Sequence, residues 1–366
     1  MHPRFDVLIA GGGPAGLAAA IALLERGSSV AVLTPPATQQ TPRSEMLPPA
    51  AESIIARLGI GDLLDSAVPL HPALSLWSTA RPEVLGHVSM LNRPAISIDR
   101  QTLVGLLQAR VETLGGRFHA SRLRAITGVP SDWRITAGPG QELHARFVVD
   151  ATGRPAHLAR RLGARLRLGA PLVARTCFLP KGVLSRLVIE ATPNGWWYAL
   201  PMRHGGTMGF LSDPSTAVEW PVYLPRPNGF SEKAETWDAR NARLSPCAGQ
   251  GWLSAGDAAA SFDPIASQGL FNALSGGFFA GNAAAEALAG NYEALDIYAE
   301  LVARTAERTH RAMPRHYANA VGHSRFWHSR RVQDLSETEF RSTSPQHNPK
   351  HYPTAFPTIS IDHGSS

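Results

Sequence analysis

The fold of this chain is decided by the stretch Phe5-Asp6-Val7-Leu8-Ile9-Ala10-Gly11-Gly12-Gly13-Pro14-Ala15-Gly16. The apolar run that ends at Ala10 predicts a strand buried in a parallel sheet. A helix is predicted over 17–26, and a second apolar strand follows at 29–33. In that setting the pattern G-x-G-x-x-G allows a tight turn, close approach to a pyrophosphate, and close packing of helix on strand. We therefore predict a dinucleotide-binding unit whose phosphates lie at Gly11, Gly13, Pro14, Ala15 and Gly16.

The second strand ends without the acidic residue that usually holds the adenosine ribose of a dinucleotide. Thr34 stands at that position and is followed by two prolines. A hydrogen bond to a carboxylate contributes roughly 1.5–3 kcal/mol, so its loss weakens binding by about one to two powers of ten. An enclosed cofactor tolerates that loss better than a loosely held, exchanging one. The sequence therefore favours a tightly held dinucleotide, or one that is partly lost on purification.

A second cofactor-binding segment is predicted near the end of the globular region. An apolar run from Trp252 ends in Gly256-Asp257, and an apolar helix is predicted from about Gln268. An aspartate at the end of a strand can bind a flexible polyol. A helix N-terminus after Pro264 directs backbone N–H groups and a positive dipole end at a bound group. A strand that ends in small residues is predicted over 147–154, and its Gly153 allows the backbone to pass close to the same cofactor.

The composition favours a two-domain enzyme of the reducing cytoplasm. The chain has 366 residues, 44% of them hydrophobic, which is enough for about two domains. Two isolated cysteines give no disulfide framework and no metal-type spacing. The apolar run over 7–24 contains the glycine turn, so we expect no membrane span, and no secretion signal precedes it. The net charge of +6 comes from scattered arginines, which argues against nucleic-acid binding and is explained as well by an anionic cofactor or an acidic partner.

Composition shifts along the chain predict an α/β fold. We expect a Rossmann-like, parallel-sheet domain with an inserted antiparallel sheet and C-terminal helices. The nucleotide-binding domain takes 1–70, 97–165 and 240–290, and the inserted substrate domain takes 71–96 and 166–239. Helices follow over 291–332, with an interruption at Pro314. The polar segment 333–366 is expected to be a loose tail or an arm for a partner.

Three motifs together resemble the FAD-dependent monooxygenases of the aromatic-hydroxylase type. They are the glycine loop, Asp150-Ala151-Thr152-Gly153-Arg154, and Gly256-Asp257 with Pro264-x-x-Ser267-x-Gly269. The likeness is greatest to the branch that holds the tryptophan halogenases and the flavoproteins that mature tryptophylquinone enzymes, namely lysine-6-oxidase, glycine oxidase and quinohaemoprotein amine dehydrogenase. Four further stretches support that branch: 44–51, 195–201, 242–246 and 326–331.

The resemblance implies FAD as the cofactor and assigns residues by position. Cofactor contacts fall on Gly11, Gly13, Pro14, Ala15, Gly16, Thr34, Arg43, Arg100, Gly153, Gly256, Asp257, Pro264, Gln268 and Gly269. Pro264, Ser267 and Gly269 are expected beside the isoalloxazine ring. The candidate bases are Glu45, His71, His87 and His204, with Glu45 preferred. Trp196, Trp197 and Phe210 are expected to form a substrate wall, with simple core packing as the alternative for the two tryptophans.

The implied reaction is hydroxylation of an aromatic ring through a flavin C4a-hydroperoxide. The substrate is either an aromatic small molecule or a tryptophan of a partner protein. No lysine precedes Lys181, and Trp196 to Pro201 copy the motif W-x-W-x-I-P incompletely, so lysine-dependent halogenation is disfavoured. Electrons could come from NAD(P)H directly or from a separate flavin reductase. Two alternatives stay open: a reductase of the geranylgeranyl-reductase type, and a non-catalytic flavin-binding maturation factor.

Overall fold

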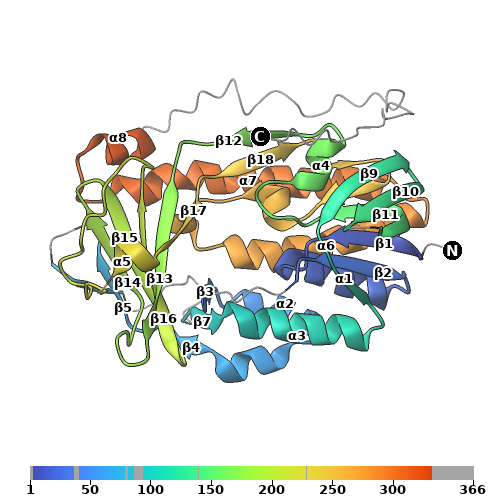
Figure 1. The fold of residues 1–366 in the computed structure, drawn as a ribbon. Coiled ribbons are helices and arrows are strands. Elements are labelled where there is room, and N and C mark those ends of the chain that lie inside the picture. The colour runs from blue at the N-terminus through green and yellow to red at the C-terminus, as the bar shows by residue number, and fades with distance from the viewer. Residues whose placement is uncertain are drawn as a thin grey trace.

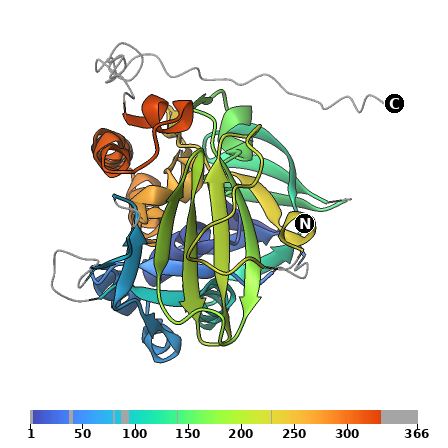
Figure 2. The ribbon, with the colours of Figure 1, turned by 90° about the vertical axis from the view of Figure 1, so that its left-hand side faces the viewer.

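The computed structural model describes residues 3–36, 41–78, 81–85, 94–138, 140–227 and 229–331. A helix-covered parallel sheet lies at one end of the molecule and a second, mostly antiparallel sheet at the other (Figures 1 and 2). This arrangement confirms the predicted fold class. No helix within the described residues is both long and apolar enough to span a membrane.

The parallel sheet is built on the apolar strand that precedes the glycine loop. Its parallel strands run in the order β20-β11-β1-β2-β8. Three antiparallel strands, β9, β10 and β19, extend it. Residues 7–10 and 30–33 are buried, as expected for central strands covered on both faces. The bounds are β1 (Arg4–Ala10), β2 (Val30–Thr34), β8 (Arg117–Ala120), β9 (Leu123–Val129), β10 (Asp132–Ala137), β11 (Glu142–Asp150), β19 (Ala248–Gly249) and β20 (Trp252–Ser254).

Two helices rich in small residues pack together beside this sheet. They are α1 (Pro14–Glu25), which follows the glycine loop, and α6 (Gly269–Leu288). A Cβ at Gly277 would lie 2.2 Å from the carbonyl oxygen of Ala15, and one at Gly281 would lie 2.4 Å from that of Ala19. The close approach of α6 to α1 therefore depends on glycine in α6. A third helix, α3 (Arg100–Thr113), begins at Asp99, whose carboxylate accepts a 3.1 Å hydrogen bond from the Thr102 amide.

The second sheet has the strand order β17-β13-β16-β15-β14-β5-β6. Its pairs are antiparallel, as predicted, except that β5 and β14 are parallel. The strand β5 comes from a segment more than a hundred residues earlier in the chain than β14. The bounds are β5 (Ala73–Leu76), β6 (Glu83–Leu85), β13 (Val173–Pro180), β14 (Val188–Thr192), β15 (Gly195–Met202), β16 (Gly205–Ser212) and β17 (Glu235–Asp238). The boundaries proposed for the two domains stay predictions.

Short elements connect the two large sheets. One three-stranded sheet has the order β3-β7-β4 and another has the order β12-β18-β21. Their strands are β3 (Ser44–Leu47), β4 (Val68–Pro69), β7 (Ile96–Asp99), β12 (Arg165–Leu168), β18 (Ala242–Ser245) and β21 (Ala260–Ser261). The remaining short helices are α2 (Ala51–Arg57), α4 (His157–Arg161), α5 (Phe230–Lys233), η1 (Gly61–Ser66), η2 (Gly256–Ala258) and η3 (Pro264–Ala266).

The C-terminal helices differ from the expectation at Pro314. The helix α7 (Glu293–Ala318) continues through Pro314, and the break comes five residues later, before α8 (Arg325–Arg331). Met313 and Tyr317 are buried on either side of the proline, so packing on both turns compensates for the one lost backbone hydrogen bond. The predicted interruption at Pro314 was therefore wrong. The expected tail, 333–366, lies outside the described residues.

Candidate flavin and substrate site

The glycine loop has the geometry of a pyrophosphate cradle. Gly11 has φ of +118°, and a Cβ there would lie 2.1 Å from the carbonyl oxygen of Ala151. A Cβ at Gly16 would lie 2.0 Å from the Gly11 carbonyl oxygen, whereas one at Gly13 would meet nothing within 4 Å. The helix α1 starts at Pro14 with no side-chain cap, so the N–H groups of its first turn are unsatisfied by the helix itself. Open space above Gly13 and free donors beside it fit a bound phosphate.

Thr34 lies beside this loop, at the end of β2. The Thr34 Oγ1 atom would lie 2.8 Å from a Cβ placed on Gly12, so the threonine side chain covers the loop from below. Its side chain is half-buried, and β2 ends here before the described residues break off at Pro36. The hydroxyl of Thr34 therefore lies at the end of β2, where a dinucleotide-binding fold usually has a carboxylate that binds the ribose.

Glu45 and Arg100 form an ion pair at the carboxyl edge of the parallel sheet. The Arg100 guanidinium, at the first turn of α3, lies 2.6 Å from Glu45 Oε1 on β3. Burial alone would lower the Arg100 pKa, but the Glu45 carboxylate outweighs it and raises that pKa. Asp257 adds to this effect from η2. The sequence-predicted residues Glu45, Arg100 and Asp257 therefore lie in one charged cluster.

The Asp257 side chain makes no hydrogen bond to any of the residues that the structure describes. Its side chain is only half-buried, although the surrounding protein desolvates the carboxylate. Burial raises the Asp257 pKa, and the neighbouring cations Arg154 and Arg100 oppose that rise. A deep, accessible acceptor next to two cations suits the hydroxyl groups of a polyol.

Arg154 is a member of this cluster for which the sequence predicted no role. It follows Gly153 after β11, and its Nη1 atom is buried with no hydrogen-bond partner in the described structure. Burial lowers the Arg154 pKa, opposed by the carboxylates of Asp257 and Asp238. A buried donor left without an acceptor costs about 1–3 kcal/mol. A bound anionic or carbonyl group would satisfy it, so the residues present fit the FAD that the motifs imply.

The turn over residues 263–269 ends at the uncapped N-terminus of α6. Asp263 accepts a 3.0 Å hydrogen bond from the Ile265 amide and so fixes η3, which Pro264 begins. Ser267 has φ of +52°, in the left-handed region, and the exposed Gln268 leads into α6 without a side-chain cap. The first N–H groups of a 20-residue helix are therefore available to an anionic group.

Aromatic side chains of the second sheet lie across from this turn. Trp196 and Tyr198 on β15 share one cluster with Trp237 on β17 and with Ile265 of the turn. The Tyr198 ring lies over Gly209, where a Cβ would be 2.5 Å from the tyrosine ring. Burial raises the Tyr198 pKa, so its half-buried phenol stays a neutral donor. This inner face of the sheet is the candidate substrate wall.

Trp197 and Phe210 lie on the opposite face of the sheet and correct the predicted wall. Both are fully buried, and their rings are 5.1 Å apart in a cluster with Trp220 and Phe230. Successive residues of a strand point to opposite faces, so adjacent tryptophans cannot both face one cavity. Core packing therefore accounts for Trp197 and Phe210, and Trp196 alone of the three predicted residues lies on the inner face. The sequence already contained the signal for Tyr198, two positions after Trp196.

The other predicted candidates are more dispersed. The Arg43 guanidinium lies 5.1 Å from the centre of the Trp237 ring and 3.3 Å from Glu235, at the margin of the inner face. His71 and His204 are exposed, the latter in the hairpin between β15 and β16. His87 lies outside the described residues. Of the candidate bases that the structure describes, only Glu45 lies in the charged cluster.

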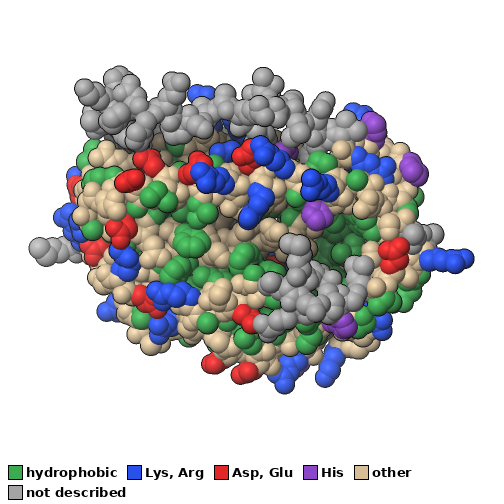
Figure 3. All heavy atoms as spheres, turned by 180° about the vertical axis from the view of Figure 1, so that it is seen from behind, with side chains coloured by type: hydrophobic (Ala, Val, Ile, Leu, Met, Phe, Trp, Pro, Cys, Tyr) green, Lys and Arg blue, Asp and Glu red, His purple; other side chains and the backbone are tan. Residues whose placement is uncertain are grey.

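A cavity of about 550 Å³ reaches the same turn from the other side of α6. It lies between α2, α6 and α7 on the rear face, where hydrophobic side chains lie among arginine side chains (Figure 3). Asp257 and Gly269 form part of its wall, and the exposed side chains of Phe279 on α6 and Leu301 on α7 line it farther out. The turn over residues 263–269 is therefore bordered by accessible space on the side of α2 and α7.

Comparison with known proteins agrees with this geometry. Residues 4–178 match the family described as the FAD binding domain. The chain is 23% identical over 324 residues to a 1H-pyrrole-2-carbonyl-[peptidyl-carrier protein] brominase of Pseudoalteromonas luteoviolacea (strain 2ta16), covering 78% of this chain and 79% of the brominase. It is 24% identical over 299 residues to LodB of Marinomonas mediterranea, named as an FAD-dependent oxidoreductase, covering 73% and 80%.

A solved structure shows the same fold over most of the chain. The peptidyl tryptophan dihydroxylase QhpG, described as essential for tryptophylquinone cofactor biogenesis, superposes with a TM-score of 0.73 at 21% identity. The superposition covers 90% of this chain and 79% of QhpG. The predicted resemblance and the predicted FAD cofactor are thereby confirmed.

Proposed function

We propose that this FAD-dependent oxidoreductase is a monooxygenase that hydroxylates an aromatic ring, and that the ring is a tryptophan side chain of a partner protein. The observation that carries the proposal is the aromatic inner face of the second sheet, which lies across from the uncapped N-terminus of α6. Bound FAD, once reduced, supplies the electrons that activate molecular oxygen. The chain itself supplies binding, orientation and exclusion of water.

The cofactor-facing residues have separate tasks in this proposal. The glycine loop and the free N–H groups of α1 hold the pyrophosphate. Asp257 accepts hydrogen bonds from the polyol chain, while Arg154 and Arg100 balance its charge. The N–H groups and dipole at the start of α6 favour negative charge on the reduced ring. Gly269, the first residue of α6, therefore contributes a backbone donor, while Pro264 and Ser267 contribute the shape of the turn.

The substrate-facing residues position a ring and handle its proton. The half-buried Trp237 supplies an aromatic face for stacking, and Tyr198 supplies a neutral hydroxyl donor. Trp196, which is 2% exposed, packs within this wall beside Tyr198. Glu45 is our candidate for the group that accepts the substrate proton. Its carboxylate accepts a hydrogen bond from the Arg100 guanidinium, which orients it.

Two comparisons support a protein-borne substrate. QhpG is named for action on peptidyl tryptophan, and the brominase is named for a substrate attached to a carrier protein. The half-buried rather than enclosed side chains at the turn agree with a substrate that stays attached to a larger molecule. The electron source is either NAD(P)H or a separate flavin reductase.

Mass spectrometry of the partner tests the proposal directly. The FAD-loaded chain, a reductant and oxygen should add about 16 or 32 Da to a tryptophan of a partner encoded beside it, as one or two oxygen atoms require. Anaerobic product formation would instead identify a reductase. Binding of partner without any mass change, with and without oxygen, would identify a maturation factor and remove the proposal.

A further inference from the structure

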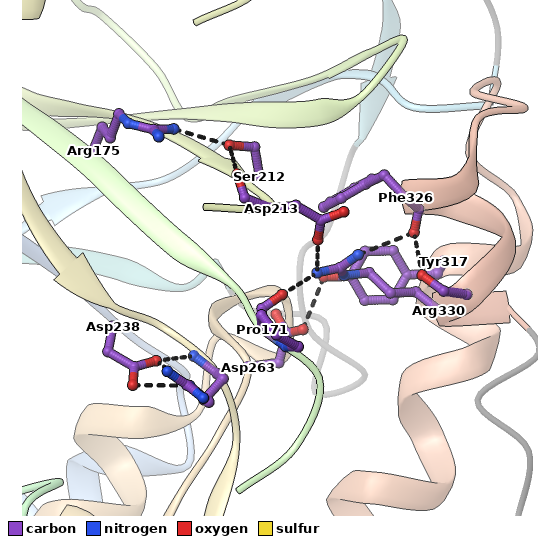
Figure 4. A network of polar contacts seen from close by, with 11 residues as sticks. Pro171, Arg175, Ser212, Asp213, Asp238, Asp263, Tyr317, Phe326 and Arg330 are labelled. Atoms are coloured by element: carbon purple, nitrogen blue, oxygen red, sulfur yellow. Dashed lines mark hydrogen bonds and ion pairs between the residues drawn. The ribbon is translucent and has the colours of Figure 1, made fainter. Parts of the chain in front are cut away.

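A buried hydrogen bond joins the flavin-facing turn to the C-terminal helices. Tyr317, near the end of α7, donates its hydroxyl hydrogen to Asp263 Oδ2 at 2.8 Å (Figure 4). The other Asp263 oxygen accepts from the Ile265 amide and so caps η3. Tyr317 is 1% exposed, and burial raises its pKa, so its hydroxyl stays protonated and donating. One carboxylate thus connects the turn to α7.

Tyr317 is itself fixed by a second set of contacts. Its ring lies among Trp77, Phe326 and Trp327, with ring centres 6.0–6.4 Å away. The backbone carbonyl oxygen of Tyr317 accepts a 3.2 Å hydrogen bond from Arg331 on α8. The tyrosine cannot move without disturbing both helices.

Arg330 anchors this assembly to the second sheet. Its guanidinium is 3% exposed, lies 3.8 Å from the centre of the Phe326 ring, and donates to the Pro171 carbonyl oxygen at 2.8 Å and to Asp213 at 3.0 Å. Pro171 precedes β13 and Asp213 follows β16, two central strands of that sheet. Figure 4 shows the chain of contacts from the strand ends to the turn. The same α7–α8 unit therefore holds the turn and the substrate wall.

The turn needs such support because of its backbone. Ser267 is a non-glycine residue at φ of +52°, a conformation that persists only where the surroundings enforce it. The cap from Asp263 and the hydrogen bond from Tyr317 lie a few residues before it. Loss of either would allow the turn and the first N–H groups of α6 to relax.

We propose that Tyr317 is a positioning residue for the cofactor, acting through Asp263 to fix the turn whose backbone donors favour negative charge on reduced FAD. The inference rests on the proposed function for its premise that this turn faces the flavin. The contacts of Arg330 with Pro171 and Asp213 fix the position of the C-terminal helices, and hence of the turn, relative to the substrate wall.

The test removes the hydroxyl group of Tyr317 and compares the result with removal of the hydroxyl group of a second buried tyrosine. In the FAD-loaded protein, Tyr317→Phe should shift the redox equilibrium of the bound flavin toward the oxidised form by about tenfold. Tyr298→Phe is the control, because Tyr298 is a buried tyrosine of the same helix whose hydroxyl donates to the Ser254 carbonyl oxygen at 2.7 Å. The two variants should lose similar thermal stability, and the control should keep the wild-type equilibrium, measured against a reference dye.

A second variant separates positioning from general destabilisation. Asp263→Ala should reproduce the shift, and the double variant with Tyr317→Phe should shift no further, since both changes break one relay. Wild-type redox behaviour in Tyr317→Phe, or an equal shift in Tyr298→Phe, overturns the inference. Failure of the unaltered chain to hold FAD overturns it as well. A shift without any hydroxylated product would sustain the inference while removing the proposed monooxygenase function.

Discussion

At the scale of single residues, the site contains polar groups that lower the stability of the folded state but are suited to binding a ligand. Asp257 is the clearest case, because burial raises its pKa while no described residue offers it a hydrogen bond. Arg154 likewise has a buried, unpaired Nη1. Such groups are expected where binding, rather than stability, has determined the residue.

Replacing Asp257 should therefore have opposite effects on stability and on FAD binding. Asp257→Asn should weaken FAD binding at least tenfold, the equivalent of one lost hydrogen bond to a charged group. The pKa of Asp257 is higher in the folded state than in the unfolded state. The folded state therefore loses stability as the pH rises from the unfolded pKa toward the folded pKa. The FAD-free variant should therefore lack that decline and unfold at a higher temperature than wild type near pH 7. Flavin fluorescence titration and thermal unfolding across pH measure the two effects; a less stable variant would contradict the account of Asp257.

Restoring an acid at the end of β2 should tighten the cofactor. The Thr34 side chain borders Gly12, where the ribose-binding carboxylate of a dinucleotide fold would stand. Thr34→Asp should improve FAD affinity by about tenfold, and Thr34→Asn, of the same size but uncharged, should improve it less. Equilibrium titration of the FAD-free protein decides the matter, and equal affinities for the two variants would show that Thr34 does not face the ribose.

At the scale of elements, the local motifs were predictable and the long-range partnerships were not. The glycine loop, the strand before it and the helix after it follow from residues within about twenty positions, so the sequence predicted them closely. The pairing of β5 with β14 and the Tyr317–Asp263 hydrogen bond join segments that no local pattern relates. The prediction that Trp197 lies on the substrate wall was wrong for a different reason. Side chains alternate between the two faces of a strand, so Trp196 and Trp197 cannot both face the same cavity.

The packing of α6 on α1 gives a matched pair of substitutions. A Cβ at Gly277 would lie 2.2 Å from the backbone oxygen of Ala15, which cannot move without separating the helices. Gly277→Ala should cost roughly 1–3 kcal/mol of unfolding free energy. The adjacent Gly276 has nothing within 4 Å of such a Cβ, so Gly276→Ala should stabilise the helix by up to about 1 kcal/mol. Denaturant unfolding of both variants measures this, and equal effects would contradict the close helix contact.

At the scale of the whole molecule, the second sheet serves two purposes through its two faces. The outer face packs Trp197, Phe210, Trp220 and Phe230 into a closed cluster. The inner face places Trp196 and Tyr198 in one cluster with Ile265 of the turn over residues 263–269. The C-terminal helices then hold that face in place through Arg330. Substitutions at neighbouring positions of one strand should therefore have different effects: those on the outer face should lower stability, and those on the inner face should lower activity toward the substrate.

Adjacent residues of β15 provide the test of that separation. Trp197→Phe removes ring volume from a fully buried position and its Nε1–H bond to the Glu219 carbonyl oxygen, so it should lower the unfolding free energy by about 1–3 kcal/mol while leaving kcat/KM near wild type. Tyr198→Phe removes one hydroxyl from the inner face, so it should leave stability nearly unchanged but lower kcat/KM at least tenfold, with more reductant consumed per product formed. Steady-state kinetics with product counted by mass spectrometry compares the two. The reverse pattern would place the substrate on the outer face of the sheet, since residues 197 and 198 differ chiefly in the side to which they point.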